Sequence, residues 1–262
     1  MTVLMGKRVV VTRALHQAAE LNDLLIAWGA IPVSYPCIDI IPPEDTDLLD
    51  TAIRNIASGE YDFVVLTSAN VACVFEARIR HLHLDVERLR TTFFACVGSG
   101  TAAAAKELLG VDVGLVASEQ IAESLADELA DIIDPGERVL LPQSELARPI
   151  LRDQLVAMGA KVDAVTAYRT VLGSGGVALR PMLAAGLIDA VTLTSTSTVK
   201  YLLRRLAGEG GGKQDLSGVC IACIGPVTAD AAHDAGIPVD VVPEEYTLRA
   251  MVAALADFLR DM

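Results

Sequence analysis

The sequence repeats itself, and this repetition constrains the fold more than any other feature of the chain. The segment Tyr61-Asp-Phe-Val-Val-Leu-Thr-Ser returns as Ile188-Asp-Ala-Val-Thr-Leu-Thr-Ser, and Ala95-Cys-Val-Gly-Ser-Gly-Thr-Ala returns as Ala222-Cys-Ile-Gly-Pro-Val-Thr-Ala. Both pairs share an offset of 127 residues (189 − 62 and 225 − 98). A different pattern, Gly6-Lys-Arg-Val-Val-Val with Trp28-Gly-Ala, returns at an offset of 130 (136 − 6) as Gly136-Glu-Arg-Val-Leu-Leu with Met158-Gly-Ala. The chain therefore has the order X, Y, X, Y, which indicates a duplication.

Each unit alternates β-branched runs with longer helical patterns. In X the sequence predicts strands near 7–12 and 31–35 around a helix near 15–28, and in its copy strands near 137–141 and 161–171 around a helix near 146–158. In Y it predicts strands near 62–67, 92–97 and 112–116, with helices near 70–80, 101–109 and 121–132. Apolar strands that alternate with helices are typical of a parallel sheet covered on both faces. We expect an α/β protein with two flavodoxin-like domains.

Periodicity leaves open which X pairs with which Y. Reading the chain in order gives domains at 1–134 and 135–262. The alternative is a continuous domain near 44–163, nested inside a domain that both ends of the chain form. Nesting needs two crossing connections, and the extended stretches 31–42 and 161–172 are suited to run side by side.

Composition excludes several classes of function. The chain has 21 Lys and Arg against 34 Asp and Glu, a net charge of −13, and no basic run, which argues against binding to DNA or RNA. No apolar run reaches the ~18 residues of a membrane span, and the first residues lack the order of a signal peptide. We therefore expect a cytoplasmic protein with no membrane or nucleic-acid partner.

The cysteines and histidines do not form a recognisable metal site. The 5 Cys are an odd number, typical of reduced thiols, and Cys220 and Cys223 lie an odd number of positions apart on a predicted strand. Their side chains should point to opposite faces, which disfavours a shared metal. The 4 His form no His-Glu-x-x-His motif. We expect no metal.

Small polar residues recur where a predicted strand ends and a helix begins. They stand at 12–13, 67–70, 98–101, 142–144, 194–197 and 225–228. The carboxyl ends of parallel strands form the ligand-binding edge of such sheets, and helix N-termini attract anions. Two edges of this kind could hold one polyanion. The alternative is that these residues only cap helices, as Ser and Thr commonly do.

Two glycine-rich stretches resemble nucleotide-binding motifs only loosely. Residues 98–103 fit the pattern G-x-G-x-x-A, with Glu119 about 20 residues further on. The repeat of this stretch at 225–230 loses the second glycine, which disfavours a pyrophosphate loop. Residues 208–213 follow a predicted helix and lack the Ser or Thr that a P-loop requires, so we expect a flexible surface loop there.

The order and spacing of six short motifs resemble one known family. They are VVVTR near the start, YDFVVLTSAN, VGSGTA, AYRT after GAKV, DAVTLTS and CIGPVTADA. In this order they are similar to the uroporphyrinogen-III synthase family from Val9 to the last helix. The resemblance implies two flavodoxin-like domains joined by a two-stranded β linker. It favours nesting, with domain 1 at 1–36 and 173–262, domain 2 at 44–163, and linker strands at 37–43 and 164–172. Phe63 stands where the family often has Trp, and we expect only a change in packing.

The resemblance also implies a reaction. Members of this family cyclise hydroxymethylbilane, a linear tetrapyrrole with eight carboxylates, to uroporphyrinogen III in tetrapyrrole (haem) biosynthesis. Water is lost, ring D is inverted through a spiro-pyrrolenine intermediate, and no cofactor is used. The enzyme class is a hydro-lyase. The expected partner is this small-molecule substrate, passed on from the preceding bilane-forming enzyme, and the expected state is a monomer.

By the same resemblance, Tyr168 of the AYRT segment is the candidate catalytic residue, donating a hydrogen bond to the departing hydroxyl. The alternative is a tyrosine that only packs on an edge strand. Ser68, Ser195, Ser197 and Thr228 match family positions that line the cleft. The full set of candidate substrate-binding residues is Arg13, Ser68, Asn70, Gly98, Thr101, Ser144, Arg148, Ser195, Thr196, Ser197, Gly225 and Thr228. Positive potential from Arg13, Arg148, Lys200 and the helix ends would reconcile the acidic chain with an anionic substrate.

Three other functions are compatible with parts of the sequence. A non-catalytic sensor of tetrapyrroles or small anions would keep the same caps, but no output domain is visible. A two-domain solute-binding protein would need an export signal. A nucleotide-dependent oxidoreductase would need a stronger phosphate-binding motif than residues 98–103 provide.

Overall fold

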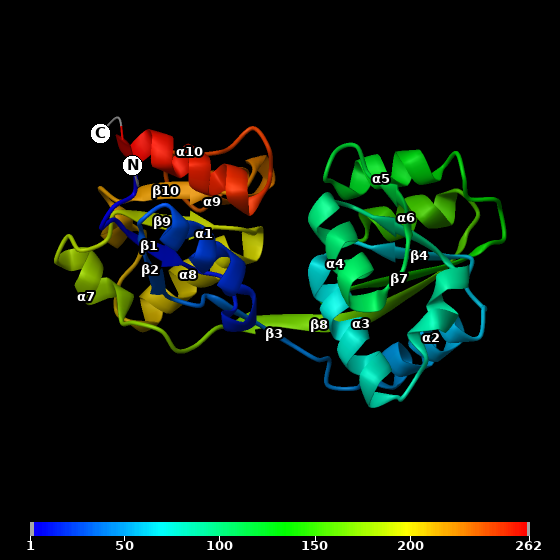
Figure 1. The fold of residues 1–262 in the computed structure, drawn as a ribbon. Coiled ribbons are helices and arrows are strands. Elements are labelled where there is room, and N and C mark those ends of the chain that lie inside the picture. Colours follow the sequence, from blue (N-terminus) through cyan, green and yellow to red (C-terminus); the bar gives the residue numbers. More distant parts are fainter. Residues whose placement is uncertain (1–2, 261–262) are drawn as a thin grey trace. The chain divides into compact units, whose positions relative to one another are not determined.

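The computed structural model describes residues 3–260, which fall into two compact units (Figure 1). The first unit joins the residues up to Asp39 with those from Val171 onward, and the second is Ile40–Thr170. The chain passes between the units within two strands, β3 (Ile38–Ile41) and β8 (Lys161–Leu172), which are neighbours in one sheet. No helix in the described part of the chain is long and apolar enough to span a membrane.

The first unit is built on a parallel sheet with the strand order β10-β9-β1-β2. Its strands are β1 (Arg8–Val11), β2 (Ile31–Ser34), β9 (Ala190–Leu193) and β10 (Cys220–Cys223). Its helices are α1 (Ala19–Ala27), α7 (Leu179–Ala184), α8 (Thr196–Gly208), α9 (Pro226–Asp234) and α10 (Leu248–Arg260), with 3-10 turns at Leu15–Gln17 and Lys213–Leu216. On one face α1 and α10 pack together (Figure 1). Leu25 and Leu255 meet Val9 and Val11 in one core. Val10 and Val191 on the other face are also fully buried, so both faces are covered.

The second unit contains a sheet with the order β3-β8-β7-β4-β5-β6, parallel from β8 to β6. Its other strands are β4 (Phe63–Leu66), β5 (Phe93–Cys96), β6 (Val113–Val116) and β7 (Arg138–Ser144). Its helices are α2 (Asp47–Ala57), α3 (Ala69–His81), α4 (Ser99–Leu109), α5 (Ala122–Leu129) and α6 (Ile150–Ala157), with a 3-10 turn at Val86–Thr91. Val64 packs into the core under α2, α3 and α4, whereas Val65 packs into the core under α5 and α6. This alternation is expected of a strand buried on both faces.

The fold class predicted from the sequence is confirmed: two parallel-rich sheets are covered by helices. The stretches expected to run side by side contain the neighbouring strands β3 and β8. Both strands are members of the six-stranded sheet. The bounds expected for the linker strands stay a prediction. Independent folding of residues 44–163 stays a prediction. The helix expected near 146–158 begins later, at Ile150, because a turn follows β7 and Pro149 occupies the N-cap position.

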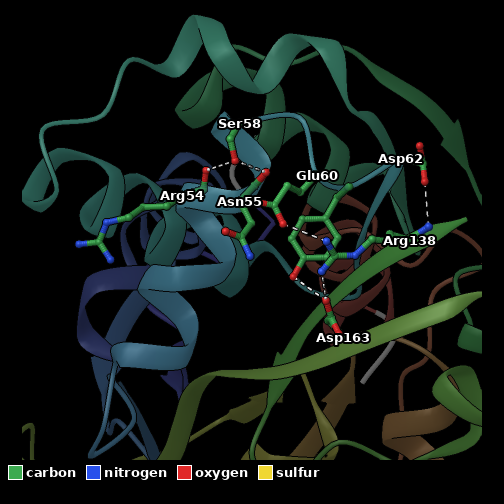
Figure 2. Close-up of polar contacts among 8 residues, drawn as sticks. Arg54, Asn55, Ser58, Glu60, Asp62, Arg138 and Asp163 are labelled. Carbon is green, nitrogen blue, oxygen red and sulfur yellow. Dashed lines mark hydrogen bonds and ion pairs between the residues drawn. The ribbon is translucent and has the colours of Figure 1, made fainter.

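A polar cluster joins the amino ends of β4, β7 and β8 in the second unit (Figure 2). The Arg138 guanidinium donates to Glu60 and to Asp163, each at 2.9 Å, and lies 4.9 Å from the centre of the Tyr61 ring. The Tyr61 hydroxyl donates to Asp163 at 2.8 Å, and the backbone N of Arg138 donates to Asp62 at 2.8 Å. Burial and then Asp163 raise the pKa of Tyr61 to about 12. The cluster ties three strands together at the edge opposite their carboxyl ends.

Candidate functional site

The carboxyl end of β9 passes directly into α8 through a capping box. The Oγ of Ser195, the N-cap residue, accepts a hydrogen bond from the backbone N of Thr198 at 3.2 Å. The Oγ1 of Thr198 accepts from the backbone N of Thr194 and of Ser195 at 3.2 and 3.1 Å, and donates to the Ser195 carbonyl at 2.7 Å. Thr196 is exposed and Ser197 half-buried on the first helical turn, where backbone N–H groups have no partner within the helix. This turn can bind an anion.

The neighbouring strand β10 passes into α9 in a similar way. Gly225 is the N-cap residue and Pro226 stands at the start of the helix. Thr228 lies in the first turn, is only 5% exposed, and its backbone N donates to the Gly225 carbonyl at 3.2 Å. The predicted positions Gly225 and Thr228 therefore form one helix start, beside the one that Ser195 caps.

Arg13 follows β1, which pairs with β9. The Thr12 hydroxyl is fully buried and donates to the Thr192 carbonyl at 2.7 Å, while the Thr192 hydroxyl donates to the Val10 carbonyl at 2.7 Å. Thr12 thus ties two strands together and does not cap a helix, contrary to the pattern read from the sequence. The Nε of Arg13 is buried without a hydrogen-bond partner. Burial lowers the pKa of this guanidinium, an effect that Glu20 partly offsets. Arg13 is a cation with an unused donor at this edge of the sheet.

In the second unit, the neighbouring strands β4 and β5 each lead into a helix. Ser68 caps α3, and its Oγ accepts a hydrogen bond from the backbone N of Asn70 at 3.1 Å. Gly98 is the N-cap residue of α4, and Thr101, 8% exposed, donates its backbone N–H to the Gly98 carbonyl at 3.0 Å. These four predicted positions lie at one edge of the sheet, where they form two adjacent helix starts.

Two other predicted positions of the second unit lie outside any helix start. Ser144 is the last residue of β7, and its Oγ accepts from the backbone N of Leu146 at 3.3 Å within a turn. Arg148 has a side chain that is 66% exposed and lies 3.5 Å from Glu123, so its charge is already paired. The expectation that Ser144 precedes a helix directly is wrong, because α6 begins only at Ile150. A substrate contact from Ser144 or Arg148 stays a prediction.

Tyr168 is placed by an irregularity in β8. Gln143 of β7 pairs with Thr166, but the next residue, Ser144, pairs with Tyr168, so that Ala167 is an extra residue, as in a β-bulge. Ala167 and Tyr168 consequently lie in the same core, although adjacent strand residues normally face opposite sides. Tyr168 as a whole residue is only 7% exposed, and its backbone carbonyl accepts from the backbone N of Glu145 at 3.0 Å. A bulge that redirects a side chain is common beside functional sites.

Sequence reasoning missed two side chains that lie over the helix-start glycines. A Cβ on Gly225 would lie 3.2 Å from the Tyr246 ring, and a Cβ on Gly98 would lie 2.8 Å from the Oε1 of Gln120. Both side chains come from loops that follow the repeated segments. The one sequence feature that could have pointed to these contacts is the glycine that the duplication repeats at positions 98 and 225.

The two cysteines of β10 are buried in the first unit. Cys220 and Cys223 are buried free thiols, and burial raises the pKa of each to about 12. Between residues 3 and 260 no group of three or more His, Cys, Asp or Glu side chains is arranged to hold a metal ion.

Comparison with known proteins places the chain in a family. The family model described as "Uroporphyrinogen-III synthase HemD" matches residues 19–253. A putative uroporphyrinogen-III synthase of Methanothermobacter thermautotrophicus is 32% identical over 254 residues, covering 95% of this chain and 97% of that protein. The uroporphyrinogen-III synthase of Synechococcus elongatus is 30% identical over 268 residues, covering 98% and 97%. The porphyrin biosynthesis protein HemD of Ruminiclostridium josui is 30% identical over 97% of this chain, which spans only 49% of that longer protein.

Solved structures have the same fold. A mutant uroporphyrinogen III synthase from Thermus thermophilus superposes with a TM-score of 0.66 at 22% identity, covering 98% of this chain and 100% of that one. A uroporphyrinogen-III synthetase from Helicobacter pylori gives a TM-score of 0.59 at 13% identity, covering 97% and 99%.

Proposed function

The chain belongs to the uroporphyrinogen-III synthase family, and from this premise we propose that it cyclises hydroxymethylbilane to uroporphyrinogen III, inverting ring D and releasing water. The match of the family model over residues 19–253 carries the proposal. The helix starts at the carboxyl edges of both sheets support it, because unpaired backbone N–H groups bind carboxylates, and the substrate has eight of them.

The binding role falls to four helix starts and one cation. In the first unit these are the N-termini of α8 and α9 beside Arg13, and in the second unit the N-termini of α3 and α4. Backbone N–H groups and the hydroxyls of the capping residues attract carboxylates without placing strong nucleophiles beside a reactive cation. Arg13 supplies a full positive charge, and its buried Nε would gain a partner when a carboxylate binds.

The chemical role falls to Tyr168. Its phenolic O–H donates a hydrogen bond to the hydroxyl group of ring A. The C–O bond breaks, the hydroxyl takes up a proton and leaves as water, and the pyrrole nitrogen lone pair stabilises the resulting azafulvene cation. Ring D attacks this cation through its substituted carbon to give the spiro-pyrrolenine. That intermediate fragments, recloses in the inverted sense and loses a proton.

The test is incubation with hydroxymethylbilane, followed by oxidation and chromatography of the porphyrin isomers. The wild-type chain should give isomer III, while the reaction without protein gives isomer I. Tyr168→Phe should lower kcat by ~10²-fold with little change in KM, because one positioned donor is lost while the carboxylate contacts remain.

Tyr61→Phe is a matched control, since it removes a phenol of the same unit that binds Asp163 at the amino edge of the sheet. It should leave the isomer III yield unchanged. If wild-type protein yields only isomer I, the proposed function is wrong. If Tyr168→Phe keeps the wild-type kcat, the phenol has no chemical role and the backbone N–H groups carry the catalysis.

A further inference from the structure

Gly225 is explained by a neighbouring ring rather than by its backbone conformation. Its φ of −173° is extended backbone, which any residue can adopt. A Cβ at this position would lie only 3.2 Å from Cδ1 and Cγ of Tyr246, closer than side chains normally approach. The glycine therefore allows the ring to lie directly on the start of α9.

Tyr246 is held at the carboxyl edge of the sheet by the chain on both sides of it. Val241 pairs with Ala222 of β10, so the chain after it runs past the end of that strand toward α10. On the other side, the Thr247 hydroxyl accepts from the backbone N of Ala250 at 3.1 Å. One side of the ring thus covers Gly225, yet 43% of the residue is exposed, and Val227 on the first turn of α9 is 52% exposed.

The duplicated half of the protein shows that the fold does not require an aromatic ring here. Gly98 has the corresponding position in the second unit, with an extended φ of −152°. The side chain that lies over it is the amide of Gln120, whose Oε1 would be 2.8 Å from a Cβ. An amide side chain covers the helix start in the second unit. Covering the helix start therefore does not by itself explain why the first unit has a tyrosine at this position.

We propose that Tyr246 is a substrate-binding residue, and that its exposed ring surface packs against a pyrrole ring of the linear tetrapyrrole. This inference rests on the proposed function. A pyrrole is flat and electron-rich, so an offset or edge-to-face contact with a tyrosine is favourable. The neighbouring starts of α8 and α9 would hold the carboxylates of that same ring, and the exposed Val227 would add apolar contact. If ring A lies there, the face of the tyrosine also attracts the azafulvene cation.

The experiment compares Tyr246→Leu and Tyr246→Phe with wild-type protein in the isomer assay. Tyr246→Leu keeps an apolar side chain but loses the ring, and should raise KM by about 3- to 10-fold, the change expected for one aromatic contact. Tyr246→Phe should restore a KM within about twofold of wild type. The melting temperature should change little in both, because each replacement keeps an apolar side chain over Gly225 and 43% of the residue is exposed in any case. Val156→Ala, which truncates an exposed apolar side chain on α6, should leave KM unchanged.

A double-mutant cycle provides a second route to the same contact. Gly225→Ala displaces the ring by a few tenths of an ångström, so it should raise KM when Tyr246 is present and have a smaller effect in the Tyr246→Leu background. The inference would be overturned if Tyr246→Leu kept the wild-type KM, or if Tyr246→Phe raised KM as much as Tyr246→Leu does. In either case, formation of isomer III by the wild-type protein would leave the proposed function standing. A wild-type chain that forms only isomer I would instead remove the proposed function and this inference with it.

Discussion

Replacing Thr198 by Val should destabilise the start of α8 and expose how much of this helix start depends on one hydroxyl. The side chain is fully buried, and its Oγ1 makes three hydrogen bonds of 2.7, 3.1 and 3.2 Å. At ~1 kcal/mol each, losing them costs about 3 kcal/mol, and the added methyl group of Val returns ~0.8 kcal/mol. We expect the free energy of unfolding to fall by ~2 kcal/mol, about a 30-fold change in the equilibrium constant.

The assay is urea unfolding followed by circular dichroism, together with amide hydrogen exchange at Thr194 and Ser195, whose N–H groups lose their acceptor. Exchange of these two amides should accelerate. Thr196→Val is the matched control, because Thr196 is exposed and should change stability by less than ~0.5 kcal/mol. If Thr198→Val changes stability as little as the control does, and exchange at both amides is unaltered, the capping box does not hold this helix start.

Three further predictions concern stability and reactivity. Asp50→Ala removes the carboxylate that the Arg78 guanidinium binds at 2.7 and 2.5 Å in a mostly buried pair. Urea unfolding should show that the free energy of unfolding falls by ~3 kcal/mol. A fall below ~1 kcal/mol would mean that the pair behaves like a surface ion pair. Gly176→Ala places a Cβ 2.1 Å from the Ser34 carbonyl oxygen, whereas the Cβ of Gly175→Ala, also at positive φ, meets nothing within 4 Å. The melting temperature should therefore fall much further for Gly176→Ala than for Gly175→Ala. Equal falls in the two variants would contradict this. Among the five cysteines Cys73 is the exposed one, while burial raises the pKa of Cys96, Cys220 and Cys223 to about 12. Iodoacetamide at pH 8 should therefore add one label per folded chain, faster as the pH rises because more of the thiol is ionised, and mass spectrometry showing two or more labels would refute it.

Local patterns predicted most of the secondary structure and part of the candidate site. Ser68 and Ser195 each lie two residues after the end of a buried strand, and both cap the next helix through their hydroxyls, as Ser in that position commonly does. The duplication placed Gly98 and Gly225 at equivalent helix starts. These features depend on neighbours within a few residues, which is why sequence reasoning could find them.

Features that depend on distant partners were out of reach. Thr12 resembles a cap in the sequence, but its acceptor is the carbonyl of Thr192 on another strand. The contact of Tyr246 with Gly225 likewise joins segments on different elements, and no local pattern marks it. Nothing in the sequence near Arg148 shows that Glu123 already pairs with it.

The extra residue in β8 has a consequence for how this chain should be aligned with its relatives. Because Ala167 has no counterpart on β7, the residues after it point to the opposite faces from those that a regular alternation would assign. An alignment with a relative that lacks the extra residue therefore needs a one-residue gap at Ala167. Without that gap, Tyr168 would be matched to a residue on the other face of the sheet, and Arg169 to a core position. The position of one gap thus decides whether a tyrosine in this strand is counted as equivalent across two proteins.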